Sequence, residues 1–277
     1  MNSFNALEHI KTNISINNCN SEFIDGFERL VNSSAEIFFS GSGFKSIVGF
    51  KNLISLNRLN IHATEDLETI IGFNKLSTIN NDLQITYNKK LRSFNGIESL
   101  KIINRDLLIN FNDVLSSLNG INGVTSINND IWIEGNESLI EISEFKSLEK
   151  LEGSLRVTYN INLVNINGFN TITTANYIKI NDNLNLKFIK GFENLQKLKG
   201  GFDLQSNISL LNMEGLNNLT KIGMAGDDVR TFLLSGDDGL TSLDDLANLQ
   251  EIHGSVRINR NAVLADCCSL VHLLDND

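Results

Sequence analysis

The 277-residue sequence contains no proline. Average usage of about 5% would predict roughly fourteen prolines in a chain of this length. A chain whose segments all donate to hydrogen-bonded ladders has little room for a residue without a backbone N–H. Turns must then be made by Asn, Gly and Asp, which tolerate left-handed backbone conformations. The missing prolines therefore favour a continuous β architecture.

Several other features are also missing. No apolar run approaches the length of a membrane span, so membrane insertion is not expected. No signal peptide is visible, because repeat-like sequence follows Met1 almost at once. A basic excess is absent as well: the net charge is −10, which argues against a nucleic-acid partner and against an anionic membrane surface.

Three cysteines do not make a disulfide framework. Cys19 lies about ten repeat units from Cys267 and Cys268, a distance on the order of 48 Å along a stack of strands, and cannot bridge to either. Buried free thiols are the default expectation. Pairing of the thiols with residues outside this chain is the alternative.

Signals of catalysis are missing too. The four histidines are scattered, and no phosphate-binding glycine loop is present. We therefore expect no enzymatic activity and no cofactor. Two acidic pairs, Asp227-Asp228 and Asp237-Asp238, could hold a hard cation such as Ca²⁺. Neither has a recognised calcium-loop spacing, and acidic loops are usually solvated, so no metal site is predicted.

What the sequence does contain is a repeat of 23 or 24 residues, with one longer unit over 215–244. Units open with an apolar residue, usually after Gly, as at Gly72-Phe73, Gly96-Ile97 and Gly168-Phe169. Within a unit, Leu83-Gln84-Ile85 alternates inward and outward, as in a short strand with one buried face. No stretch has the length and periodicity of a stable helix.

This pattern predicts an all-β fold, a parallel β-solenoid of about eleven coils that forms one domain over residues 1–277. An Asn recurs three residues after the strand of successive coils, at Asn88, Asn112, Asn136, Asn160, Asn183 and Asn207. Stacked amides can satisfy backbone groups of the turns, so these residues are expected to be structural and not a binding site.

The pattern Gly-Phe-x-x-Leu-x-x-Ile-x-x-x-Leu-x-Ile-x-x-Asn-x-x-Leu-x-x-Phe, read over 72–94, resembles the receptor L-domain type of leucine-rich repeat. The stretches 216–222 and 261–270 are close to a version found in secreted bacterial surface proteins. Similar arrays occur in the ligand-binding ectodomains of growth-factor and insulin-type receptors. The resemblance implies a right-handed solenoid with a binding role, extracellular or at the cell surface.

The two ends of the solenoid differ in sequence. Residues 265–277 have a candidate N-capping Asp266 and apolar spacing at Leu270 and Leu274, which predicts a short helix that closes the stack. The first coil, which begins at Phe4, has no comparable cap and would present an open ladder. Self-association through this first coil is therefore one expectation.

The outward positions between the buried strand residues form one row along the solenoid. The row comprises Ser15, Phe38, Asn60, Gln84, Leu108, Trp132, Arg156, Lys179, Asp203, Leu233 and Arg257. Trp and Arg are enriched at binding hot spots. We therefore predict a ligand-binding surface made by Gln84, Leu108, Trp132, Arg156 and Lys179, with a protein or glycan as the ligand. Packing of Trp132 against its neighbours is the alternative for that residue, and a structural or adhesive rod that assembles through its uncapped N-terminal end is the alternative for the protein.

Overall fold

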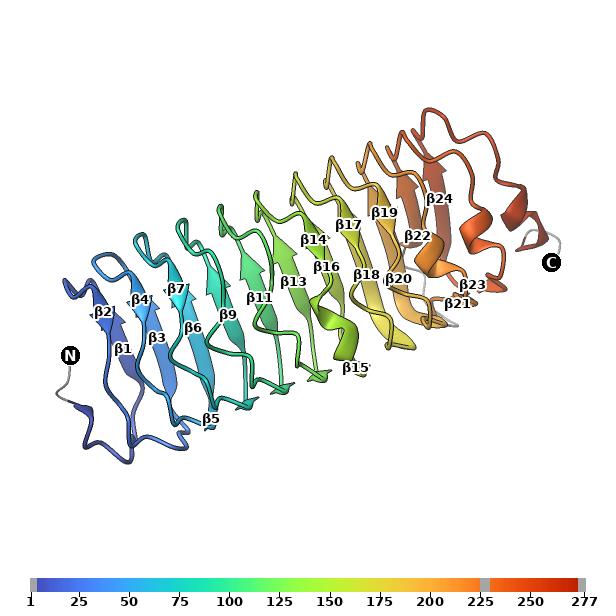
Figure 1. Ribbon diagram of the computed structural model, residues 1–277. Helices are drawn as coiled ribbons and strands as arrows, with labels where there is room; N and C mark the ends of the chain where they lie inside the picture. The colour runs from blue at the N-terminus through green and yellow to red at the C-terminus, as the bar shows by residue number, and fades with distance from the viewer. Residues whose placement is uncertain (1–3, 225–229, 274–277) are drawn as a thin grey trace.

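A computed structural model describes residues 4–224 and 230–273. The chain forms a parallel β-solenoid of about ten turns with almost no helix. The coils follow one another along a rod, with the two ends of the chain at its two ends (Figure 1). The predicted all-β solenoid is confirmed.

One strand of every coil belongs to the largest sheet. Its members are β1 (Ile14–Asn17), β3 (Glu36–Ser40), β6 (Arg58–His62), β9 (Leu83–Thr86), β11 (Leu107–Asn110), β13 (Ile131–Glu134), β16 (Leu155–Thr158), β18 (Thr174–Asn181), β20 (Lys197–Gln205), β22 (Arg230–Ser235) and β24 (Ser255–Asn259). The short strand β21 (Lys221–Ile222) also pairs with β20, and β23 (Glu251–Ile252) pairs with β21. We call the surface of this sheet that faces away from the core the strand face.

Two-residue strands form the other sides of the coil. One sheet contains β5 (Ser55–Leu56), β8 (Thr78–Ile79), β10 (Ile102–Ile103), β12 (Ser126–Ile127) and β15 (Lys150–Leu151). Two smaller sheets contain β2 (Phe23–Ile24), β4 (Ser46–Ile47) and β7 (Thr69–Ile70), and β14 (Glu141–Ile142), β17 (Asn165–Ile166) and β19 (Phe188–Ile189). The 3-10 helices are η2 (Glu144–Ser147), η3 (Glu214–Leu216), η4 (Asp244–Leu246) and η5 (Cys268–Leu273).

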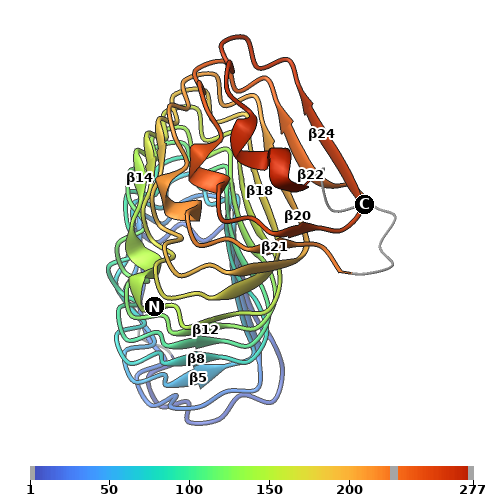
Figure 2. The same ribbon diagram turned by 90° about the vertical axis from the view of Figure 1, so that its right-hand side faces the viewer.

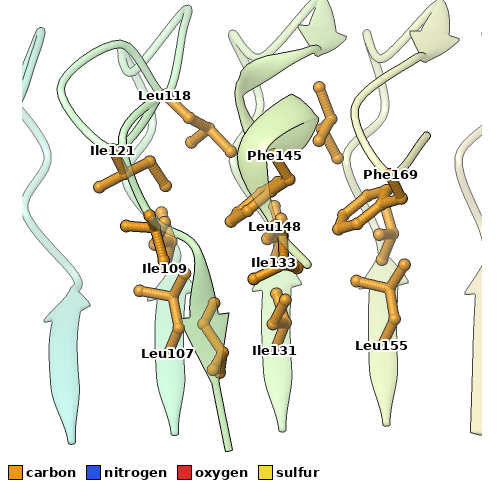
Figure 3. Close-up of a cluster of buried hydrophobic side chains, with 14 of the residues drawn as sticks. Leu107, Ile109, Leu118, Ile121, Ile131, Ile133, Phe145, Leu148, Leu155 and Phe169 are labelled. Atoms are coloured by element: carbon orange, nitrogen blue, oxygen red, sulfur yellow. The ribbon is translucent and has the colours of Figure 1, made fainter. Parts of the chain in front are cut away.

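The core is a stack of identical layers. Leu and Ile side chains from the strands point inward, such as Leu107 and Ile109 on β11 and Ile131 and Ile133 on β13 (Figure 3). Phenylalanines that open successive coils stack ring on ring, as between Phe145 and Phe169, whose centroids are 4.9 Å apart. Each coil therefore buries its apolar side chains mainly against the coils before and after it, which is why the repeat must continue for the core to close.

The asparagine positions are structural, as predicted. Asn88, Asn112, Asn136, Asn160, Asn183 and Asn207 are fully buried. The Oδ1 atom of Asn136 accepts hydrogen bonds from the backbone N–H and the Nδ2 of Asn112, both at 3.1 Å. Its Nδ2 donates to the carbonyl of Ile109 at 2.8 Å. We call this column the asparagine ladder.

The C-terminal prediction is correct in part. Asp266 caps the last turn by accepting the N–H of Cys268 at 2.8 Å, but the element is a 3-10 helix, and residues 274–277 lie outside the described residues. In Figure 2, which looks onto this end, η5 lies beside η4 and β24 runs along the sheet edge. Val256 on β24 is in register with the core residue Phe232 yet remains 51% exposed. The predicted closure of the stack is therefore wrong for the β24 side of the last coil.

The prediction of buried thiols is wrong for two of the three cysteines. Cys19 is half-buried and packs against the core, whereas Cys267 and Cys268 are exposed. All three are free. The reason is positional: Cys267 and Cys268 lie where η5 begins on the last coil, and among the described residues no later coil covers them.

Candidate functional site

The predicted outward row exists as a continuous register of strand pairs. Leu108 pairs with Gln84 and with Trp132, Trp132 pairs with Arg156, and Arg156 pairs with Lys179. The five predicted site residues thus lie on the consecutive strands β9, β11, β13, β16 and β18. Parallel strands in register hold neighbouring side chains about 5 Å apart. The structure therefore brings all five together on the strand face.

Trp132 is the centre of this row, and it is half-buried. The guanidinium carbon of Arg156 lies 4.5 Å from the centroid of its ring, in a cation–π contact. Its indole N–H donates to Oδ2 of Asp130 at 3.4 Å. The ring is thus fixed by its row neighbours, which is the packing alternative, but it also keeps part of its surface in contact with solvent.

Two cations, Arg156 and then Lys179, follow Trp132 in the row. Within the described residues, neither Arg156 nor Lys179 forms an ion pair. The Nε of Arg156 is buried and has no hydrogen-bond acceptor. A buried N–H without an acceptor costs about 1–3 kcal/mol.

The next residue in the row is Asp203, which is in register with Lys179. It is buried and accepts a hydrogen bond from Nε2 of Gln205 at 2.6 Å. It also accepts from the hydroxyl of Tyr177. Burial, together with the charge of Asp203, raises the pKa of Tyr177 to about 12, so the phenol remains protonated and donates. The cationic part of the row therefore ends at Asp203, which is hydrogen-bonded to Gln205 and Tyr177.

The other end of the row is neutral. Leu108 is half-buried between its neighbours on β9 and β13. Gln84 is half-buried as well, and its Oε1 accepts from Nδ2 of Asn60 at 3.0 Å. The five residues therefore form a surface that changes from polar and apolar at Gln84 and Leu108 to cationic at Arg156 and Lys179. We call these five residues the row site.

The row of carboxylates on one side of the row site is bound within the protein. Asp82 pairs with Arg58 at 2.8 Å. Asp106 accepts the N–H of Asp130 at 3.1 Å, and Asp130 accepts the N–H of Ser154 at 2.8 Å. These carboxylates are therefore held by groups of neighbouring coils.

Sequence reasoning missed a group of aromatic residues just after the strands. Tyr87 and Phe111 stack at 4.8 Å, His62 contacts Tyr87 edge-on, and Tyr159 is 54% exposed on a later coil. Tyr87, Phe111 and Tyr159 all have φ near +60°, which is uncommon for bulky residues. The sequence does contain a signal for this group, since each of these three aromatic residues directly precedes a ladder asparagine.

One of the two acidic pairs, Asp237-Asp238, lies within the described residues. Asp237 is fully buried, whereas Asp238 is exposed and accepts the N–H of Ala262 at 3.1 Å. The expectation of a solvated pair is therefore wrong for Asp237, because it occupies the ladder position of its coil. Asp227 and Asp228 lie outside the described residues. Among the described residues, no group of three or more His, Cys, Asp or Glu side chains could hold a metal ion.

Comparison with protein-family models gives no match, and comparison with curated proteins gives none either. Over the described part of the chain, none of the helices has the length and apolar character needed to cross a membrane.

Proposed function

We propose that the protein is a non-catalytic recognition module of a cell-surface or secreted protein, related to the receptor L-domain type of leucine-rich repeat. Its ligand is a protein or glycan that carries an anionic group and binds along the row site. The observation that supports this proposal is the pair of cations, Arg156 and Lys179, neither of which forms an ion pair with another described residue. Trp132 beside them offers apolar contact area on a rigid sheet.

Trp132 also provides the readout, since it is the only tryptophan. Its fluorescence should change when the protein is titrated with polygalacturonate, dextran sulfate or polyglutamate, and it should not change with neutral dextran. Arg156→Gln and Lys179→Gln should each weaken the binding by about tenfold, which corresponds to about 1.4 kcal/mol. Trp132→Ala should weaken the binding at least as much. Because this variant has no tryptophan, its binding is measured by calorimetry.

Lys75→Gln is the matched control, because Lys75 is an exposed cation away from the row site. This variant should bind as the unchanged protein does. If Lys75→Gln and Arg156→Gln weaken binding equally, the attraction is a general charge effect and the row site is not the binding surface. If none of the anionic polymers binds, the anionic ligand class is wrong.

A second candidate function is a structural rod that assembles end to end, and exposed core positions at both ends favour it. Phe4, which opens the first coil and stacks on Phe27, is 43% exposed, and Val256 on the last coil is 51% exposed. Phe4, Leu7, Ile10 and Ile14 line an open hollow at the first coil. One edge of β1 and one edge of β24 have no strand partner among the described residues.

A further inference from the structure

The asparagine ladder depends on a side chain that both accepts and donates. At each position the Oδ1 accepts from the preceding coil, and the Nδ2 donates to a carbonyl of that coil. Asn207 shows the pattern: its Nδ2 donates to the carbonyl of Ile180 at 2.8 Å. It also donates to the ladder residue of the next coil, whose side-chain oxygen lies 3.0 Å away. That next residue is an aspartate.

Asp237 occupies the ladder position in register with Asn207 and Asn261. Its Oδ1 accepts from the backbone N–H of Asn207 at 2.9 Å, as a ladder Oδ1 does. Its own N–H donates to Oδ1 of Asn261 at 2.9 Å. Its Oδ2, which replaces the amide nitrogen, is buried and has no hydrogen-bond partner. The acceptor half of the ladder position is therefore intact, and the donor half is not.

The register predicts which group Oδ2 faces. Asn207 donates to the carbonyl three residues before the previous ladder residue, and Asn261 donates in the same way to Leu234 at 3.3 Å. The equivalent acceptor for position 237 is the carbonyl of Leu204. A carboxylate oxygen there would lie among other oxygens, whereas a carboxylic acid has an O–H that can donate. We propose that the ladder holds Asp237 as the neutral acid, so that the last coil is fastened while Asp237 is protonated and loosened when it loses its proton.

The charged groups around Asp237 agree with a neutral acid. Burial raises the pKa of Asp237 to about 7, and the negative charge of Asp203 on β20 acts in the same direction. Asp238, the next residue in the chain, is itself acidic and does not stabilise a negative charge on Asp237. Arg257 on β24 and Arg260 behind it form no ion pair with Asp237. Only the hydrogen bonds from neighbouring backbone and from Asn207 favour the charged form.

The sign of the pH dependence follows from this shift. The pKa of Asp237 is higher in the folded protein than in the unfolded chain, so the folded protein binds more protons between about pH 4 and pH 7. The stabilising effect of the proton is complete below about pH 4 and is lost as the pH rises through 7. The coil that responds runs from Asp237 through β24 to η5.

Asp237→Asn tests the proposal, because asparagine restores the donor. The variant should be more stable than the unchanged protein at pH 8, with a higher urea midpoint, and should lose this advantage at pH 4. Hydrogen exchange of the β24 amides should slow at pH 8 in the variant alone, after correction for intrinsic rates. Asp238→Asn is the matched control, and its pH profile should follow that of the unchanged protein.

A direct measurement on the unchanged protein guards against a folding defect in the variant. The carboxyl carbon of Asp237, assigned by its disappearance in Asp237→Asn, should titrate near pH 7 in a ¹³C NMR experiment. A midpoint below pH 5 would overturn the proposal. Stabilisation of the unchanged protein by added CaCl₂ or NaCl at pH 8, absent from Asp237→Asn, would show that a cation and not a proton occupies the Oδ2 side.

Discussion

At the scale of the residue, the ladder shows why asparagine and not another polar side chain recurs in the turns. Each ladder residue is surrounded by a backbone N–H, a backbone carbonyl and the amides of two neighbours, as at Asn136. A neutral amide both accepts and donates through one planar group of this size, which a carboxylate cannot do. A buried partner left without its hydrogen bond costs about 1–3 kcal/mol, so a single exchange in the ladder has a large effect.

Asn136→Asp should transfer the behaviour proposed for Asp237 to the middle of the rod. The variant should be less stable at pH 8 than at pH 4, by about 1.36 kcal/mol for each unit by which the fold raises the pKa of the new carboxyl group. Urea unfolding at the two pH values measures this difference. Asn136→Ala, which cannot titrate, should be destabilised at both values. Equal stability of Asn136→Asp at pH 4 and pH 8 would contradict the prediction.

At the scale of the element, the glycine that opens a coil permits the close approach of the coil before it. A Cβ on Gly72 would lie 2.1 Å from the carbonyl oxygen of Gly49 and 2.8 Å from the backbone of Val48. Real Cβ atoms do not approach backbone so closely, and the coil spacing set by the strand hydrogen bonds leaves no room to retreat. Gly72 is therefore needed for space, since its φ is not in the left-handed region.

Gly72→Ala should therefore separate two coils locally and lower the thermal unfolding midpoint. The expected cost is about 1–3 kcal/mol, the usual range for overpacking. Gly200→Ala is the comparison, because its Cβ would lie no nearer than 3.1 Å, next to the Asn176 side chain. Calorimetry of both variants should show a clearly larger loss for Gly72→Ala. Similar losses would mean that the strand spacing yields and that the glycine is dispensable.

At the scale of the whole molecule, each coil is stabilised by its neighbours, so the coils at the ends have one neighbour fewer. The core is fully buried in the middle coils, yet Phe4, Val256 and Val263 remain exposed at the ends. Exposed apolar side chains beside an open strand edge favour addition of another strand. A heterologous end-to-end contact of this kind would build an open filament.

Val256→Lys should prevent such assembly with the fold intact, because Val256 is half-exposed and a charge on the open edge opposes strand addition. Analytical ultracentrifugation over a range of concentrations should show elongated oligomers of the unchanged protein and monomers of the variant. Ile140→Lys, which places a charge on a 55% exposed residue of a middle coil, is the control and should still associate. If the unchanged protein is monomeric at all concentrations, end-to-end assembly is wrong.

The sequence alone was enough for the repeat, the coil, the strand row and the structural role of the asparagines. Residues one period of 23 or 24 residues apart occupy equivalent places in successive coils, so the pattern of one coil predicts which residues of the next are buried and which face outward. The row site followed from the same register, because Leu108, Trp132 and Arg156 occupy equivalent positions. Whether that site binds a ligand is a prediction for the titrations above.

Only the tertiary structure shows the side-chain contacts and the exposure of individual residues, because these depend on neighbours that the repeat pattern does not specify. The contact of Arg156 with the Trp132 ring, the exposure of Cys267 and Cys268, and the open β24 side of the last coil depend on side-chain directions and on the absence of a further described coil. Asp237 shows the limit best. In sequence it is half of an acidic pair in a loop, and only the stack reveals that its carboxyl group is enclosed between two asparagines, out of reach of water.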